Sequence, residues 1–469
     1  MPLSRLVARR DEPGRELDFL IGKVFNERNR QLPGELNVPH SKSAPRRSTI
    51  AARNIADLEL RAARRLPAPI WHYLQGGADD EWTAARNTSA FERYALVPDV
   101  LIDVAHIDAS VKLLGHRYPL PLMLSPTGMS QLFHADGEMA VARSAAAHQI
   151  LYTLSTMATS TIEDVATAGG PRMFQLYCFR DRGLTLELLS RAQAAGYVAI
   201  CLTVDTPLAG NRERDIATGM TLPPRFTLRT LFQFAAHPRW VLPKLFGRPF
   251  DLANVTRYAP SVSRRRTGVM EYVNSQMDRS IDWKYLEWLR LNWAGALVVK
   301  GILSPSDARR AAELGCEGVM ISNHGGRQLD GVISPIEQLA SIRDAVGESL
   351  SLILDGGVRR GTHVLKAIAL GASACAIGRP YLFGLAAGGE RGVTRAIEIF
   401  REEIERGMAL MGCTSLEMLG RRHVRDTLAQ LPFAAFDERL SASVSAPATS
   451  ALPIGVSLAP YPCSDGAHG

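Results

Sequence analysis

Eight short apolar runs recur along the middle of the chain, and none of them alternates between apolar and polar positions. A continuously apolar run is typical of a strand that is covered on both faces, as in a parallel sheet. Segments with helical character separate the runs, so strands and helices alternate. The predicted strands are Leu120–Pro126, Leu151–Thr156, Arg172–Cys178, Ala199–Asp205, Ala296–Gly301, Gly318–Asn323, Leu350–Gly356 and Ala374–Gly378.

Start and stop signals for helices lie between these runs. Ser304, followed by a proline, predicts a helix that Gly315 closes. Ser334 and Glu337 have the spacing of a capping box, and Gly347 closes the helix that they begin. Eight alternating strands and helices favour an α/β fold of the (β/α)8 TIM-barrel type over an open doubly wound sheet. No G-x-G-x-x-G follows the first strand, so a dinucleotide site is not expected.

One connection breaks this alternation, between the fourth and fifth predicted strands. It contains a long excursion over residues 213–280, and such a segment in a barrel usually has a function. Within it, Phe226–Phe250 interleaves aromatic residues and leucines with arginine and lysine. Two interpretations stay open: a lid packed on the barrel rim, or a basic amphipathic surface that lies on anionic lipid.

The two ends of the chain lack the barrel pattern. Residues 1–48 are polar and rich in arginine, which predicts a flexible basic extension. Residues 441–469 are rich in serine, alanine and proline, and we expect a disordered tail there. The barrel domain is therefore predicted over residues 49–440.

Composition narrows the class of protein. Hydrophobic residues make up 46% of the chain and charged residues 22%, as in soluble globular proteins. No apolar run reaches the roughly 18–20 residues of a membrane helix, and no secretory signal is visible. We expect a cytoplasmic protein, peripheral on the inner face of the cell membrane if the excursion binds lipid. The six cysteines form no C-x-x-C pair, so buried reduced thiols are expected, with neither a metal site nor disulfides.

The net charge of +7 is concentrated in two segments. Residues 1–65 carry +6 and residues 221–269 carry +8, which leaves −7 on the remainder. Basic segments can bind nucleic acid, but no helix-turn-helix, zinc-finger or RNA-binding signature accompanies them. Nucleic acid is therefore not expected as a partner.

Chemistry gathers at the carboxyl ends of the strands in a barrel. The sixth predicted strand runs into SNHGGRQLDG, residues 322–331, where His324 and Arg327 leave the strand together. Oxidation of the carbon next to a carboxylate needs a proton acceptor and an anion holder. A lone histidine is more often structural, but Asp205 at a neighbouring strand end would hydrogen-bond the imidazole and stabilise its protonated form. Arg212 follows Asp205 closely in the sequence, and it could join Arg327 in a carboxylate clamp.

Glycine-rich turns follow the seventh and eighth strands, at Asp355–Arg359 and at Gly378 and Arg379. Their backbone N–H groups and arginines are suited to a phosphate. Lys300 ends the fifth strand, where it would either neutralise negative charge on a bound group or be an ordinary surface lysine. For Tyr73, spacing alone predicts a helix-end aromatic in the core.

Together these motifs resemble the family of FMN-dependent α-hydroxy-acid oxidases and dehydrogenases, which includes glycolate oxidase, flavin-linked L-lactate dehydrogenase and mandelate dehydrogenase. The likeness is collinear from about Ile55 to about Arg425. It implies that His324 is the base, Asp205 its partner and Lys300 the cation beside the flavin. It implies that substrate is held by Tyr73, Tyr177, Arg212 and Arg327. FMN would be bound by Pro126, Thr127, Gly128, Ser155, Gln175, Thr203, Lys300 and Ser322, and its phosphate by Asp355, Gly356, Gly357, Val358, Arg359, Gly378 and Arg379.

Three positions depart from the glycolate oxidase pattern. Gly128 replaces an alanine, which resembles the membrane-linked dehydrogenases, while Met157 replaces a tryptophan and Ala209 a leucine, which should widen the cavity. We therefore expect an FMN-dependent dehydrogenase that oxidises an (S)-2-hydroxy acid, foremost L-lactate, and passes electrons to a quinone-type acceptor. The alternative is an oxidase of the same family that uses oxygen on a longer or aromatic 2-hydroxy acid. The resemblance also implies a homotetramer, and it leaves little room for a flavin-dependent isomerase or an idle flavoprotein.

Overall fold

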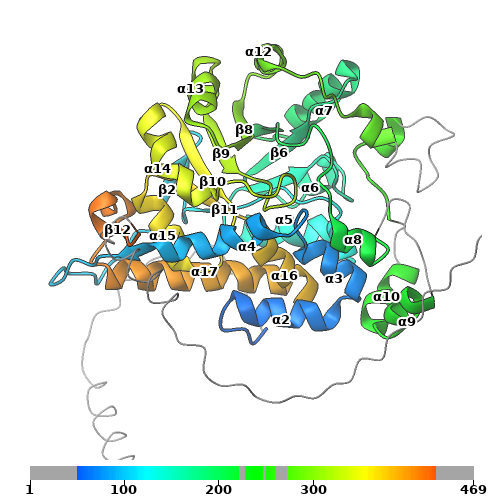
Figure 1. The fold of residues 1–469 in the computed structure, drawn as a ribbon, viewed down its shortest axis with the longest axis horizontal. Coiled ribbons are helices and arrows are strands. Elements are labelled where there is room, and N and C mark those ends of the chain that lie inside the picture. The colour runs from blue at the N-terminus through cyan, green and yellow to red at the C-terminus, as the bar shows by residue number, and fades with distance from the viewer. Residues whose placement is uncertain (1–49, 221–227, 247–249, 259–271, 429–469) are drawn as a thin grey trace, which may run out of the picture. The chain divides into compact units, whose positions relative to one another are not determined.

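The computed structural model describes residues 50–220, 228–246, 250–258 and 272–428. Eight parallel strands close into a barrel in chain order, with the last strand pairing with the first (Figure 1). All eight predicted strands and the predicted TIM-barrel class are thus confirmed. The strands are β4 (Leu122–Leu124), β5 (Tyr152–Ser155), β6 (Arg172–Tyr177), β7 (Ala199–Thr203), β8 (Ala296–Ile302), β9 (Gly318–Ser322), β10 (Ser351–Asp355) and β11 (Ala374–Ile377).

Most strands are shorter than the apolar runs that predicted them. Pro126 and Asp205, for example, lie beyond the last paired residues of β4 and β7, where the chain bends into loops. The register sets polar residues of adjacent strands side by side near the carboxyl end of the barrel. These partners are Ser155 with Gln175, Tyr177 with Thr203, Thr203 with Lys300, and Ser322 with Asp355.

Helices follow the strands and cover the barrel (Figure 1). The predicted caps are confirmed: Ser304 accepts a hydrogen bond from the Asp307 amide, and Ser334 and Glu337 form a capping box. The outer helices are α5 (Gly137–Ala147), α6 (Ile162–Ala166), α7 (Arg182–Ala194), α12 (Trp283–Asn292), α13 (Pro305–Glu313), α14 (Pro335–Val346), α15 (Gly361–Ala369), α16 (Arg379–Gly388) and α17 (Glu390–Leu410).

The amino end of the barrel is closed by a hairpin of β2 (Val111–Leu113) and β3 (His116–Tyr118). Leu113 and Tyr118 belong to the buried cluster that fills the barrel interior with side chains such as Met320. The open end of the barrel is therefore the carboxyl end, where ligands bind in this fold.

Short elements before and after the barrel complete the fold. In α2 (Ile55–Arg65), Asn54 caps the first turn by accepting from the Asp57 amide. Helix α2 packs against α16 and α3 packs against α8, so the segment before the barrel lies over its carboxyl end. The remaining elements are α3 (Ala68–Gln75), α4 (Trp82–Ser89), η1 (Ala90–Arg93), β1 (Tyr94–Leu96), η2 (Ser130–Leu132), η5 (Leu416–Met418), η6 (Arg421–His423) and β12 (Val424–Asp426).

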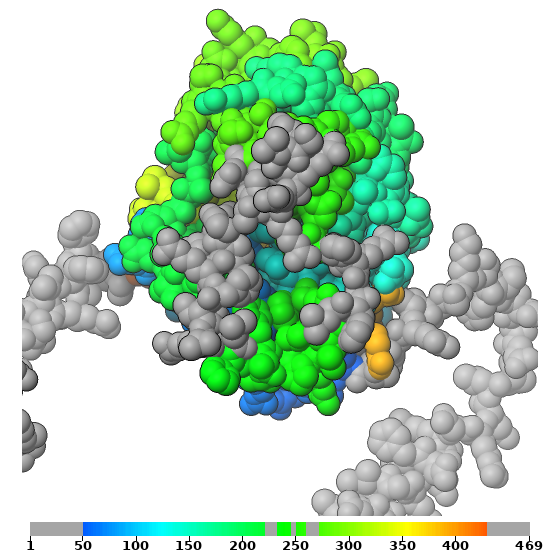
Figure 2. Space-filling view, turned by 90° about the vertical axis from the view of Figure 1, so that its right-hand side faces the viewer, coloured from blue at the N-terminus to red at the C-terminus, as the bar shows by residue number. Residues whose placement is uncertain are grey.

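The excursion after β7 contains α8 (Glu213–Ala217), α9 (Leu228–Ala235), α10 (Pro238–Phe246) and η3 (Thr256–Tyr258). Helices α9 and α10 lie side by side near α3, and they reach the surface beside the N-terminal helices (Figures 1 and 2). Trp240 Nε1 donates to the Leu132 carbonyl at 2.8 Å, and Lys244 donates to the carbonyl of Gln131. Phe232 is 75% exposed and Leu242 is 52% exposed. The excursion thus combines a rim-packed side with an exposed apolar side.

Several other sequence predictions concern residues that the structure describes only in part. The five described cysteines are buried and free of disulfides, as expected, whereas Cys463 lies outside the described residues. The N-terminal extension and the C-terminal tail also lie outside them, so their predicted disorder stays a prediction. Among the described helices, none has the length and apolar character needed to cross a bilayer.

Candidate active site

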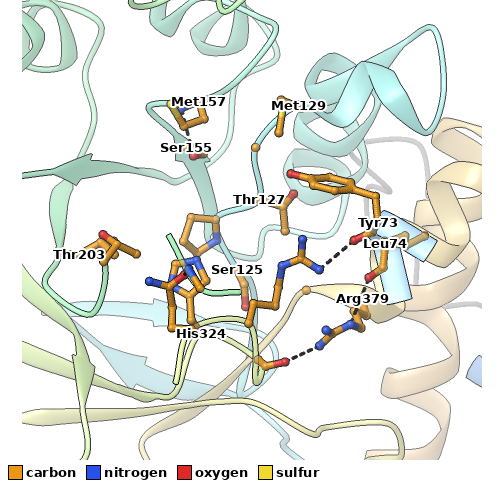
Figure 3. A pocket seen from close by; sticks show the side chains of 18 of the residues that line it. Tyr73, Leu74, Ser125, Thr127, Met129, Ser155, Met157, Thr203, His324 and Arg379 are labelled. Atoms are coloured by element: carbon orange, nitrogen blue, oxygen red, sulfur yellow. Dashed lines mark hydrogen bonds between the residues drawn. The ribbon is translucent and has the colours of Figure 1, made fainter. Parts of the chain in front are cut away.

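A cavity of about 500 Å³ opens at the carboxyl end of the barrel. Figure 3 looks into it, with Thr203 and His324 on one side and Tyr73 and Arg379 on the other. Every predicted site residue lines this cavity except Asp205 and Ser322, which lie directly behind His324 and Lys300. Those that line it are Tyr73, Pro126, Thr127, Gly128, Ser155, Gln175, Tyr177, Thr203, Arg212, Lys300, His324, Arg327, Asp355, Gly356, Gly357, Val358, Arg359, Gly378 and Arg379.

His324 and Asp205 form the predicted pair. His324 Nδ1 lies 2.9 Å from Asp205 Oδ1, so the imidazole presents its other nitrogen, Nε2, to the cavity. The backbone after β9 turns sharply, since His324 has φ +58° and its amide donates to Ser322 Oγ at 3.0 Å. Gly301 makes room for the carboxylate: a Cβ there would lie 2.6 Å from the Cβ of Asp205.

The environment prepares this pair for proton transfer. Burial lowers the pKa of His324, and Asp205 opposes that effect. The imidazole is therefore neutral near pH 7 and able to accept a proton. Burial alone would raise the pKa of Asp205, but Lys300 and His324 outweigh it and lower that pKa to about 2. A charged carboxylate thus stands behind a neutral base.

Lys300 anchors a buried charge network under the pair. It is only 4% exposed, which excludes the surface-lysine interpretation. Its Nζ donates to Ser322 Oγ at 3.1 Å and lies 3.7 Å from Asp205 Oδ2 and 3.5 Å from Asp355 Oδ2. Asp355 also accepts from Ser322 and Ser125. Burial alone would lower the pKa of Lys300, but the two carboxylates raise it above its ordinary value, so the ammonium stays charged.

Two arginines and Tyr73 face this base across the cavity. The guanidinium carbons of Arg327 and Arg212 lie 4.9 Å and 5.9 Å from the centre of the Tyr73 ring. Arg327 Nη1 donates to the carbonyls of Tyr73 and Gly76, which fixes the side chain. The spacing-based prediction for Tyr73 holds only in part: the residue lies near the end of α3 and packs against the core, but it is half-buried and also lines the cavity. Burial raises the pKa of Tyr177 to about 12, so its hydroxyl remains a donor.

The glycine-rich turns form the far end of the cavity. At Gly357 the backbone has φ +76° and passes so close to the Asn87 carbonyl that a Cβ would overlap it. Arg379 donates to carbonyl oxygens of Leu74, Gly325 and Gly76, and burial lowers its pKa to about 9. A buried guanidinium that is bonded to carbonyls rather than to a carboxylate is a favourable partner for an anion.

Comparison with known proteins identifies the family to which this fold belongs. The model of the family described as FMN-dependent dehydrogenase matches residues 62–426. The chain belongs to this family. It is 41% identical to glycolate oxidase of Spinacia oleracea over 372 residues, which is 79% of this chain and 95% of that protein. It is 42% identical over 392 residues to a protein of Mycobacterium tuberculosis named "Putative L-lactate dehydrogenase", covering 83% of this chain and 93% of that one.

Solved structures agree with this assignment. A structure described as the monotopic membrane protein (S)-mandelate dehydrogenase is 36% identical, with a TM-score of 0.77 over 80% of this chain and 100% of that one. Mandelate oxidase with benzoyl-formic acid is 36% identical, with a TM-score of 0.68 over 80% of this chain and 98% of that one. The predicted family of FMN-dependent hydroxy-acid oxidases and dehydrogenases is confirmed, and the cofactor of this chain is FMN.

The residues of the cavity fit that cofactor. Gln175 accepts from Ser155 Oγ and donates to Thr203 Oγ1, both at 2.9 Å, so a polar ladder crosses β5, β6 and β7. Such a ladder suits the polar edge of a flavin ring, and the buried ammonium of Lys300 suits its reduced state. The glycine turns and the half-buried side chains of Arg359 and Arg379 suit its phosphate. The roles of individual residues toward FMN stay predictions.

Asp215 and Gln328 are among the residues of this site that were not predicted from the sequence. Asp215, at the first turn of α8, is 6% exposed and lines the cavity beside the arginine clamp. Gln328 donates to the carbonyls of Asp205 and Leu208 and accepts from the Gly210 amide, so it ties the loop after β7 to the loop after β9. The three-residue spacing of Arg212 and Asp215 was a usable signal for the first. No local pattern indicates the second.

Proposed function

We propose that this FMN-dependent dehydrogenase oxidises an (S)-2-hydroxy acid to the 2-oxo acid, with His324 as the base. One observation supports this most: the carboxylate-backed imidazole of His324 shares a cavity with the two guanidiniums of Arg212 and Arg327. A proton acceptor and a carboxylate holder thus lie on either side of one substrate-sized space.

In this mechanism the substrate carboxylate binds Arg327, Arg212 and the Tyr73 hydroxyl, and Tyr177 donates to the substrate. His324 Nε2 takes one proton, from the hydroxyl or from the α-carbon, and Asp205 stabilises the imidazolium that forms. When bound, FMN would supply the two-electron oxidising power of the reaction, with capacity for the second hydrogen that the substrate loses. The ammonium of Lys300 stabilises negative charge on the cofactor's side of the cavity. Asp205 and Asp355 keep that ammonium charged.

The substrate's side chain is expected to be apolar. Besides its polar residues, the cavity is lined by the apolar side chains of Met157, Ala209, Met220, Val273 and Met277. These side chains offer no charged partner to a substrate. The short side chain of Ala209 leaves room for a substituent on the α-carbon that is larger than a hydrogen atom. L-Lactate is our first candidate. The second candidate is (S)-mandelate, which is favoured by these apolar side chains and by the likeness to solved structures of (S)-mandelate dehydrogenase and mandelate oxidase.

We further propose a quinone-type acceptor and a peripheral place on an anionic membrane. Gly128 supports the dehydrogenase assignment, and the exposed Phe232 and Leu242 of the excursion support contact with lipid. The structural relative named as a monotopic membrane protein supports it as well. The alternative acceptor is oxygen, and the homotetramer remains a prediction from the family resemblance.

The test is anaerobic flavin bleaching, first with L-lactate and then with (S)-mandelate, followed by timed re-oxidation with air or a soluble quinone. The wild type should bleach, and recovery should be faster with quinone. His324→Ala should retain FMN, but at least one of these acids should no longer bleach its flavin. His423→Ala is the matched control, because His423 is buried beside Asp99 at 3.2 Å and does not line the cavity. Full bleaching in His324→Ala contradicts the assignment.

A further inference from the structure

Asp215 is a buried carboxyl group beside the arginine clamp, and the reaction proposed above does not use it. It is 6% exposed, and it lines the same cavity as His324. Its Oδ2 lies 3.8 Å from Arg212 Nε, beyond hydrogen-bond distance. Its Oδ1 is buried without a hydrogen-bond partner among the described residues. A buried carboxyl with an unsatisfied oxygen is costly, so its position calls for an explanation.

Helix α8 places this group. Arg212 is the N-cap of α8, and Asp215 lies in the first turn, so the two side chains lie on one face of the helix. Because α8 packs against α3, Asp215 Oδ1 faces Gly76, where a Cβ would lie only 3.7 Å away. The carboxyl thus lies beside α3, the helix whose Tyr73 ring is faced by the guanidiniums of Arg212 and Arg327.

Several charged and titratable groups face Asp215. Burial raises its pKa, and Arg327 and Arg212 oppose that rise only in part. The groups that face it are Arg212 at the N-cap of α8, Arg214 of α8, Arg327 of the loop after β9, Glu81 before α4, and His72 of α3. Glu81 is itself paired with Arg214, so the clamp arginines are the cations that govern Asp215.

We propose that Asp215 is a positioning residue that holds Arg212 in the empty site and takes up a proton when a substrate carboxylate arrives. The inference rests on the proposed function, because it needs a carboxylic acid bound at Arg212 and Arg327. The incoming carboxylate competes with Asp215 for the same two guanidiniums. When two carboxylates share one site, one of them binds a proton.

The direction of the pH effect follows from this competition. A bound acid raises the pKa of Asp215 further, so binding is coupled to proton uptake. Affinity for the acid is then highest below the pKa of Asp215 in the free enzyme. It falls by up to tenfold for each pH unit until the pKa of the complex is reached. With Asp215→Asn there is no competing charge, so binding should be tighter at high pH and less dependent on pH.

The experiment uses the oxidised FMN-loaded enzyme with pyruvate and benzoylformate as probes. Titration calorimetry in buffers of different ionisation enthalpy counts the protons taken up from pH 5 to 8, and the flavin spectrum reports binding independently. Because a bound acid also favours protonation of His324, the count is repeated in His324→Ala. We expect uptake of up to one proton in His324→Ala, and loss of that uptake in the His324→Ala/Asp215→Asn double variant. Asp164→Asn, an exposed carboxyl on α6, is the charge control.

Each outcome decides the inference. Binding without proton uptake in His324→Ala overturns it, and so does equal uptake after Asp215→Asn is added. If the variants fail to fold, the wild type still decides, since binding that is independent of pH over this range overturns the inference. If neither acid perturbs the wild-type flavin, the proposed function fails and the inference fails with it.

Discussion

Replacement of Asp205 by asparagine tests the central pair of this site. The variant keeps the shape of the side chain but removes the charge 2.9 Å from His324 Nδ1. A hydrogen bond to a charged group contributes about 1.5–3 kcal/mol, which corresponds to about 10–150-fold in rate. At an effective dielectric constant of about 20, two unit charges at that separation interact by about 6 kcal/mol, which sets a ceiling of about 10⁴-fold. We therefore expect the rate of flavin reduction to fall by at least about tenfold.

The assay is anaerobic stopped-flow reduction of the bound flavin as a function of pH. FMN should stay bound, because Lys300 keeps Asp355 at 3.5 Å. Asp205 raises the pKa of His324, so its removal should lower that pKa further. The base acts in its neutral form, so the acidic limb of kcat/KM should move to lower pH. Asp99→Asn, at the His423 pair, is the matched control. A change below threefold in Asp205→Asn, or a limb that moves to higher pH, refutes the reasoning.

Three further variants test the supports of the site. Lys300→Met should lower stability by about 3–5 kcal/mol and weaken FMN retention, since it leaves the buried carboxylate of Asp205 without its cation; unchanged thermal unfolding and flavin content would contradict this. Gly301→Ala should also destabilise the protein and slow flavin reduction. The reason is that residue 301 has φ +106° and its new Cβ would lie 2.6 Å from Asp205 Cβ. A melting temperature equal to that of the wild type would show that this close approach does not limit residue 301. Gly128→Ala should disturb the flavin spectrum, because its Cβ would lie 2.9 Å from that of Met157. Met157→Gly, which removes that Cβ, should bring the spectrum of the double variant back towards normal; a normal spectrum in the single variant would count against this.

Much of the barrel could be predicted from sequence because its signals are local. Continuous apolar runs mark strands that are buried on both faces, and the caps at Ser304 and Ser334 mark helix starts. Polar residues at the strand ends were then brought together by the fold itself, as the pairing of Ser322 with Asp355 illustrates. The roles proposed for His324 and Arg327 could be predicted because both residues lie in one short loop.

Other parts of the site depend on contacts that no local pattern records. Tyr73 lies on α3, about 130 residues before Asp205, and only packing over the carboxyl end of the barrel brings it to the cavity. Gln328 acts through three hydrogen bonds to a loop that is distant in sequence. Lys300 could be a surface lysine by its position in the sequence, and only its burial between two carboxylates reveals a charged core.

The distribution of charge explains why the two sides of the cavity suit successive steps of the proposed reaction. On one side, one ammonium faces two carboxylates, Asp205 and Asp355, so this network is negative while His324 is neutral. When His324 takes up a proton, the net charge of this network becomes zero. On the other side, two guanidiniums face one buried carboxyl, Asp215, so the clamp is cationic whether or not that carboxyl carries a proton. A substrate carboxylate reduces that excess. An anion is thus attracted to the clamp and a proton to the base, so one bound hydroxy acid satisfies both sides.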